Sequence, residues 1–273
     1  DMTLTFVGLK SGLFLGDAPD YCGDLRFAGL DIPDEYRDGI APAYRRIDES
    51  LLAQALAPRP RGAHKGDFGH VLVVGGGEGM PGAARLAAEA ALRTGAGRVS
   101  IATHPSHAAM LVATRPELMS HAIAAKADLK PLLEKADVVV FGPGLGQSEW
   151  ARELYELVAV ADQPAVWDAD ALNLLAQDRR SVENRVITPH PGEAATLLGC
   201  SAADIQADRP AALASLVEQY GGTAVLKGAG SLISSGSVPF VCGSGNPGMA
   251  SPGMGDVLTG IVAALIAQGL NPG

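Results

Sequence analysis

A regular alternation of buried-strand runs and helical segments, which begins at residue 70, constrains the fold more than any other feature of the sequence. The strand runs are rich in valine and isoleucine, and they read HVLVVGG, RVSIAT, ADVVVFGPG, PAVWDAD, RVITPH and TAVLK. Continuous apolar strands separated by helices are typical of a mostly parallel sheet covered on both faces. The sequence therefore predicts an α/β fold, with SLISS and SVPFV as a hairpin and a final helix that begins near Met254.

Composition excludes several classes of protein. Of the 273 residues, 47% are hydrophobic, which is enough for a sizeable core, and the net charge of −9 disfavours nucleic acid as a partner. Three scattered cysteines without a CxxC motif, Cys22, Cys200 and Cys242, argue for a reducing compartment and against a disulfide framework or a zinc site. The longest apolar run, 257–270, is too short to span a bilayer, and no signal segment opens the chain. We expect a soluble cytoplasmic protein with no membrane partner.

The first 45 residues stand outside the alternation. They contain two short β-like pieces, TLTFVGL and LRFAGLDI, joined by the turn-rich segment GDAPDYCGD. The chain opens in a strand without an initiator methionine, and it stops just after a helix with NPG. We therefore expect two parts, residues 1–45 and 46–273, and a polypeptide that continues beyond both ends.

The loops after the predicted strands are where a ligand should bind, because ligands of parallel sheets bind beyond the carboxyl ends of the strands. In the first of these loops, Gly77, Gly79 and Gly82 satisfy GxGxxG, the pattern of dinucleotide-binding loops. The next strand ends in IATHPSH, without the acid that would hold a ribose. A turn for close packing, or the floor of an active site, is therefore favoured over a dinucleotide site, and the GxxxxGK[ST] phosphate loop is absent.

Three further loops carry polar candidates. Asp168 and Asp170 could bind a metal, although capping of the following helix by Asp170 is the favoured interpretation. In TPHPGE, two prolines hold His190 at a strand end, which favours a functional side chain over a structural one. Lys227 ends the strand TAVLK, and it either serves the same edge of the sheet or extends into solvent.

The stretch GNPGMASPGMGD precedes the last helix and places many glycines before one acid, Asp256. The first backbone N–H groups of a helix have no intrahelical partner, and glycines let a phosphate approach them closely. A carboxylate beside a phosphoryl group is unfavourable unless it has a task, and removing a proton from an attacking hydroxyl is such a task. Stabilisation of the helix start alone would explain Asp256 but not the glycines.

These motifs carry a family resemblance. GMGDVLTG resembles the anion-hole-and-base motif of the ribokinase-like superfamily. In order over about residues 60–270, HKGDFGHVLVVGG, PGAARLAAEAALRTGAGRV, FGPGLG, DADALN, TPHPGEAATLLG, VLKGAGSLI and GNPGMASPGMGDVLTGIVAAL resemble the ADP-dependent NAD(P)H-hydrate dehydratase family. Residues 1–45 resemble the tail of the NAD(P)H-hydrate epimerase domain that precedes the dehydratase in fused bacterial proteins. The resemblance implies a ribokinase-like three-layer α/β/α fold and a homo-oligomer.

The resemblance also implies an activity. The family converts hydrated nicotinamide nucleotides, NADHX and NADPHX, back to NADH and NADPH, and it couples this to the conversion of ADP to AMP and phosphate, with Mg²⁺. Phosphorylation of the ring hydroxyl makes a good leaving group, which the ring nitrogen then expels. The bacterial-style fusion favours ADP over ATP, whereas the preference between NADHX and NADPHX stays open.

Residue roles follow from the same motifs, position by position. Asp256 is implied as the catalytic base, and Glu193 as a group that organises Mg²⁺ through water. The implied nucleotide-binding residues are Lys227, Gly228, Ala229, Gly230, Ser231 and Gly255. The implied substrate-binding residues are Ala83, Gly144, Gly146 and His190, together with Asp256. The position of Pro252 is more often glycine in the family, and a proline there removes one N–H donor to phosphate.

Three alternative interpretations remain to be weighed against the dehydratase. A small-molecule hydroxyl kinase of the same superfamily shares GxGD, but TPHPGE and the epimerase-like segment favour the dehydratase. A non-catalytic nucleotide-binding module is disfavoured by the presence of Asp256. A dehydrogenase of the dinucleotide-binding class is disfavoured by the missing ribose acid.

Overall fold

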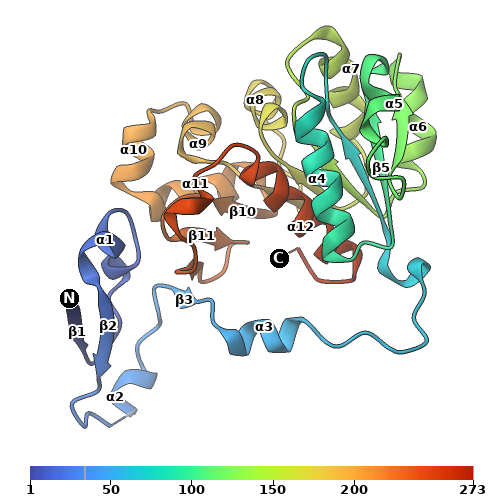
Figure 1. The fold of residues 1–273 in the computed structure, drawn as a ribbon. Coiled ribbons are helices and arrows are strands. Elements are labelled where there is room, and N and C mark those ends of the chain that lie inside the picture. The colour runs from blue at the N-terminus through green and yellow to red at the C-terminus, as the bar shows by residue number, and fades with distance from the viewer. Residues whose placement is uncertain (34, 273) are drawn as a thin grey trace.

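The computed structural model describes residues 1–33 and 35–272, and its central feature is one large sheet (Figure 1). The order of the strands in this sheet is β3 (Arg45–Arg46), β12 (Phe240–Cys242), β11 (Ser231–Ser234), β10 (Thr223–Leu226), β9 (Arg185–Ile187), β8 (Ala165–Trp167), β7 (Val138–Phe141), β4 (His70–Val74), β5 (Arg98–Thr103) and β6 (Met119–Ala122). Only the β10–β11 and β11–β12 pairs are antiparallel among the described strands. The predicted parallel sheet and hairpin are thus confirmed.

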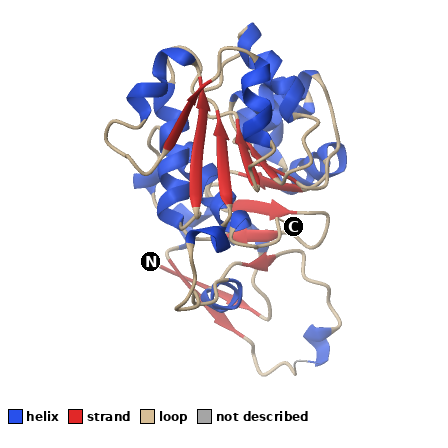
Figure 2. Ribbon diagram, turned by 90° about the vertical axis from the view of Figure 1, so that its right-hand side faces the viewer, coloured by secondary structure: helices blue, strands red, loops and turns tan. Residues whose placement is uncertain are grey.

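Helices cover both faces of the sheet, and Figure 2 shows the strands lying between them. Alternate residues of β4 explain the two layers, because Leu72 and Val74 belong to one buried cluster, and Val71 and Val73 belong to the other. The second cluster includes alanines of α4 (Pro81–Thr94) and α12 (Met254–Ala267). The first cluster includes residues of α6 (Lys126–Leu133), α7 (Glu149–Val158), α8 (Asp170–Gln177), α9 (Pro191–Leu198), α10 (Ala202–Ala207) and α11 (Arg209–Tyr220). This is the expected three-layer α/β/α architecture.

The N-terminal residues form a small separate sheet, in which β1 (Met2–Phe6) pairs in parallel with β2 (Asp24–Ala28). Between these strands lie the short helices η1 (Ser11–Leu13) and α1 (Ala18–Cys22). We call residues 1–28 the N-terminal unit, and it lies beside the main body in Figure 1, in dark blue. The connection continues through α2 (Glu35–Asp38), β3, α3 (Glu49–Ala55) and η2 (Lys65–Phe68).

The first strand to join the large sheet, β3, lies at the predicted boundary between residues 45 and 46. The assignment of residues 1–45 to the end of an epimerase-like domain and a linker stays a prediction. Elsewhere, η3 (Pro105–His107) and α5 (Ala108–Leu111) follow β5, and η4 (Pro247–Met249) lies shortly before α12. None of the helices in residues 1–33 and 35–272 is both long and apolar enough to cross a membrane.

Candidate functional site

Two glycine-rich loops join at the carboxyl edge of the sheet. The N–H of Gly76, just after β4, donates to the carbonyl of Pro143 at 3.0 Å, and the N–H of Gly77 donates to Gly144 at 2.7 Å. A Cβ atom on Gly144 would lie 3.0 Å from the Cβ of Ala83, so the first turn of α4 closely approaches the GPGLG loop. The structure therefore brings together the predicted substrate residues Ala83 and Gly144 in one surface.

The DAD segment after β8 sends its two carboxylates in different directions. Ala169, between them, has φ 51° and ψ −122°, an unfavourable backbone conformation for a residue with a side chain. Asp168 is buried, whereas Asp170 accepts a hydrogen bond from the N–H of Gly146 at 2.8 Å. The prediction that Asp170 caps α8 is wrong, because Ala169 occupies the N-cap position and the Asp170 carboxylate is directed to the GPGLG loop.

Asp168, Glu193 and Lys227 form what we call the acid–lysine cluster. The Nζ of Lys227 lies 2.8 Å from Oδ1 of Asp168 and 3.6 Å from Oε2 of Glu193. The other carboxylate oxygen of Asp168 lies 2.9 Å from the hydroxyl of Thr259, on α12. Only 19% of the Lys227 side chain is exposed, so the alternative of a solvated strand-end lysine is wrong.

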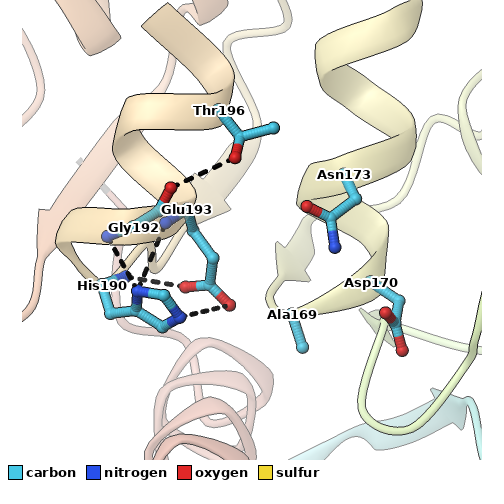
Figure 3. A pocket seen from close by; sticks show the side chains of 7 residues that line it. All are labelled: Ala169, Asp170, Asn173, His190, Gly192, Glu193 and Thr196. Carbon is cyan, nitrogen blue, oxygen red and sulfur yellow. Dashed lines mark hydrogen bonds and ion pairs between the residues drawn. The ribbon is translucent and has the colours of Figure 1, made fainter. Parts of the chain in front are cut away.

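His190 and Glu193 cap α9 reciprocally (Figure 3). The Nδ1 atom of His190 accepts from the N–H groups of Gly192 and Glu193 at 3.0 and 3.2 Å. In return, the N–H of His190 donates to Oε2 of Glu193 at 2.7 Å. The His190 ring is thus fixed by a structural bond, while Nε2 stays on its outer edge, 3.5 Å from Oε1 of Glu193.

A small cavity of about 320 Å³ lies between α8 and α9, and we refer to it as the small cavity. Figure 3 shows side chains of the two helices facing each other across it. Its lining is mostly polar and consists of Ala169, Asp170, Asn173, His190, Gly192, Glu193 and Thr196. Burial raises the pKa of Glu193, and the nearby Lys227 ammonium opposes this effect.

Asp256 lies in the first turn of α12. Gly253, which precedes this helix, has a left-handed backbone conformation with φ 87°. Burial, followed by the negative charge of Asp168, raises the pKa of Asp256 to about 6, against the effect of Lys227. A Cβ atom on Gly255 would lie 3.3 Å from Asp168 Oδ2 and 3.4 Å from Lys227 Nζ, so the start of α12 adjoins the acid–lysine cluster. A carboxyl group with a pKa near neutrality can both take up and release a proton.

A second, larger cavity of about 770 Å³ is lined by Lys227, and we refer to it as the large cavity. All six predicted nucleotide-binding residues line it: Lys227, Gly228, Ala229, Gly230, Ser231 and Gly255. Residues of the 243–250 loop, of α12 and of the N-terminal unit complete its wall, among them Leu13, Phe14, Leu25, Pro247, Leu258 and Ile261. The sequence did not predict the contribution of the N-terminal unit, because turn-rich segments carry no periodicity that indicates where they pack.

Another residue that the sequence reasoning missed is Arg209, at the start of α11. Its buried guanidinium group donates to the carbonyls of Leu226 and Lys227 at 3.1 and 3.3 Å. It thereby supports the KGAG loop. In the sequence, an arginine within an ordinary helical pattern gives no sign of such a role. Across residues 1–33 and 35–272, no group of three or more His, Cys, Asp or Glu side chains is arranged to hold a metal ion.

Comparison with known proteins shows the family that the sequence motifs resemble. The profile of the NAD(P)H-hydrate dehydratase family matches residues 71–273. A curated relative from Coxiella burnetii, named bifunctional NAD(P)H-hydrate repair enzyme, is 49% identical over 272 residues, which cover 99% of this chain and 56% of the relative. The chain thus spans little more than half the length of such relatives.

Solved structures give the same result for the fold. A ribokinase-like superfamily protein from Enterococcus faecalis superposes with a TM-score of 0.75 at 30% identity, covering 84% of this chain and 82% of that one. A Bacillus subtilis protein superposes with a TM-score of 0.74 at 28% identity, covering 85% and 84%. The latter is described as an ADP/ATP-dependent NAD(P)H-hydrate dehydratase co-crystallised with ATP and Mg²⁺.

Proposed function

Because the chain belongs to the NAD(P)H-hydrate dehydratase family, we propose that it regenerates NADH and NADPH from (6S)-NADHX and (6S)-NADPHX while converting ADP to AMP and phosphate. The observation that carries the proposal is the position of Asp256. This acid lies in the first turn of α12, next to Gly255, which lines the large cavity and contacts the acid–lysine cluster. In this proposal Asp256 would act as the base beside the large cavity, where the phosphoryl group would meet the hydroxyl group of the hydrate.

The proposed reaction has two steps. Asp256 takes the proton of the ring hydroxyl, the hydroxyl oxygen forms a bond to the terminal phosphorus of ADP, and the bond from that phosphorus to the bridging oxygen breaks to release AMP. The ring nitrogen then donates its lone pair, the carbon–oxygen bond breaks and phosphate leaves. The adjacent ring carbon loses a proton to water, and its C–H electron pair forms the ring double bond and returns the lone pair to nitrogen, which gives the dihydronicotinamide ring. The raised pKa of Asp256 makes the carboxylate a stronger base than an ordinary aspartate.

Two groups would stabilise the phosphoryl group during its transfer. The first N–H groups of α12 point out of the helix start, where they and the helix dipole favour negative charge. Lys227, which lines the large cavity, brings a positive charge beside them. Pro252 removes one possible donor from this loop, so the N–H groups from Gly253 onward would carry the contact.

Magnesium fits the donor set of this site. Mg²⁺ is commonly held by one or two carboxylates together with substrate phosphates and water, rather than by a complete protein cage. Glu193, whose carboxylate lies 3.6 Å from Lys227 Nζ, would organise the ion through water. When bound, the ion would neutralise charge on the phosphate oxygens.

Other parts of the assignment rest on the family resemblance. His190, Gly144, Gly146 and Ala83 would contact the hydrate, in or beside the small cavity. ADP would be preferred to ATP, and residues 1–45 would be the end of an epimerase-like domain. Homo-oligomer formation and a cytoplasmic location also stay predictions.

A hydroxyl kinase of the same superfamily is the second candidate, because Asp256 and the start of α12 could equally serve phosphorylation of another alcohol. The direct test mixes the purified chain with NADH hydrate, ADP and Mg²⁺ and follows the NADH absorption band. Recovery of NADH with matching release of AMP and phosphate is expected. Consumption of nucleotide with a vitamin-like alcohol, without any recovery of NADH, would establish the kinase instead.

A further inference from the structure

The N-terminal unit returns to the main body at the large cavity. Leu13, Phe14 and Leu25 line the same cavity as Lys227 and Gly255, although more than 200 residues separate the two groups in sequence. The family profile begins at residue 71, so this wall lies outside the matched region. The contact therefore supplies something that the dehydratase motifs do not include.

Tight contacts hold this wall against the KGAG loop. Gly230 has φ 66°, and a Cβ atom there would collide with the carbonyl oxygen of Phe14. The Phe14 ring also lies against Gly243, where a Cβ atom would be 3.7 Å from Cδ1. The guanidinium carbon of Arg46, in β3, lies 5.6 Å from the centre of the Phe14 ring. Phe14 is thus fixed between the loop and the edge of the large sheet.

The large cavity combines a small charged part with a mostly apolar lining. Lys227 and Gly255 lie beside the acid–lysine cluster. Half-buried apolar side chains contribute much of the remaining lining, namely Leu13, Phe14 and Leu25 of the N-terminal unit with Val257, Leu258 and Ile261 of α12. A phosphate gains nothing from such a surface, whereas a flat heterocycle buries its faces against it.

We propose that Leu13, Phe14 and Leu25 form the base side of the nucleotide site, with Phe14 in contact with the purine ring. The inference rests on the proposed function, since it requires that ADP binds in the large cavity with its phosphates at Lys227. The N-terminal unit thereby sets nucleotide affinity, and the KGAG loop alone does not complete the site.

The first test compares ADP with inorganic pyrophosphate, which carries the phosphates without the base. Binding of each is measured by calorimetry to the full chain and to two variants, Phe14→Ala and Phe27→Ala. Phe27 belongs to the same unit but is 48% exposed and does not line the cavity, so it is the matched control. Phe14→Ala should weaken ADP binding about tenfold and leave pyrophosphate binding unchanged, because stacking of a base on an aromatic ring is typically worth about one order of magnitude or more in affinity.

Three outcomes would overturn the inference. Unchanged ADP affinity in Phe14→Ala would put the base elsewhere, and equal loss for both ligands would indicate collapse of the loop rather than loss of a base contact. If the wild-type chain binds pyrophosphate but ADP no more tightly, the base makes no contact. A wild-type chain that binds neither ligand would instead overturn the proposed function itself.

A second measurement avoids the risk that Phe14→Ala loosens the N-terminal unit. Cys22 also lines the large cavity, whereas Cys200 is exposed and lies elsewhere, after α9. Alkylation of the wild-type chain is followed by mass spectrometry at both cysteines. ADP should slow alkylation of Cys22 several-fold and leave Cys200 unaffected, and pyrophosphate should protect neither. Equal alkylation of Cys22 with and without saturating ADP would contradict the proposal.

Discussion

The two cavities share one boundary, the acid–lysine cluster, and differ in almost everything else. The small cavity lies between two neighbouring helices and has a mostly polar lining. The large cavity is assembled from four separated segments, and its lining is mostly apolar. Asp256 experiences charge from both sides, since Asp170 and Glu193 line the small cavity and Lys227 lines the large one. Under the proposed function, the hydroxylated ring would bind on the polar side and the nucleotide in the large cavity.

The largest effect should come from Asp256, the proposed base, which follows Gly255 at the start of α12. Asp256→Asn should lower kcat by a factor of about 10² to 10⁴, the usual contribution of a general base. ADP affinity should stay the same or increase, because a negative charge beside the phosphates has been removed. Steady-state recovery of NADH and calorimetric titration with ADP measure the two quantities separately.

The control for Asp256→Asn is Asp162→Asn, an exposed acid on the surface that lines neither cavity. It should leave both quantities unchanged. If Asp256→Asn retained more than a tenth of the wild-type kcat, Asp256 would not be the base, and the two cavities would need another connecting group.

The acid–lysine cluster should lose stability when one of its charged side chains is removed. Lys227→Met leaves Asp168, with 3% of its side chain exposed, without its ammonium partner but still beside the Thr259 hydroxyl, and it should cost about 3–5 kcal/mol in free energy of unfolding. ADP affinity should fall at least tenfold, because the positive charge at the phosphate end is lost. Chemical denaturation and ADP titration measure the two effects.

A matched double variant separates stability from binding. Lys227→Met combined with Asp168→Asn removes both charges of the pair, so most of the lost stability should return while ADP affinity stays low. A double variant as unstable as the single one would mean that packing of the lysine stem, rather than the buried charge, dominates.

The secondary-structure elements that arise from local sequence patterns could be predicted from the sequence. The alternating valine-rich strands, the hairpin and the start of α12 were all predictable, because strand and helix signals lie within a few residues of one another. Helices α6 and α10 were missed, since α6 carries Pro131 in its interior and α10 has only one short turn of pattern. Neither affects the site.

The contacts between distant segments could not be predicted in the same way. The Asp168–Lys227 pair joins residues 59 positions apart, and nothing in WDAD indicates that the first acid is directed inward while the second is not. That choice is made by the unusual backbone of Ala169, an ordinary residue in the sequence. The apolar wall formed by Leu13 and Phe14 was equally hidden, because it depends on how a separate small sheet packs.

A smaller effect should distinguish the small cavity from the large one. His190→Ala should raise the KM for the hydrate several-fold and cost about 1 kcal/mol through loss of the α9 cap. His190→Asn should restore the cap, since an asparagine oxygen can accept from the same N–H groups, but not the KM. ADP affinity should be unchanged in both variants. If ADP affinity fell in parallel with hydrate affinity, the two cavities would not hold different ligands.

The smallest effect concerns the pH dependence of stability, and it tests whether Asp256 is held in a costly environment. Its native pKa of about 6 lies above that of an unfolded aspartate, so the native state binds the proton more tightly. The contribution of Asp256 to stability should therefore fall as the pH rises from about 4 to about 6, whereas Asp256→Asn lacks this contribution because asparagine does not ionise. The variant should melt a few degrees higher than wild type at pH 7.5, and this advantage should shrink toward pH 4. Asp162→Asn, measured in parallel, should show no such trend. Equal melting temperatures for wild type and Asp256→Asn across this range would mean that the carboxylate is not destabilised, and that its surroundings are not tuned for proton transfer.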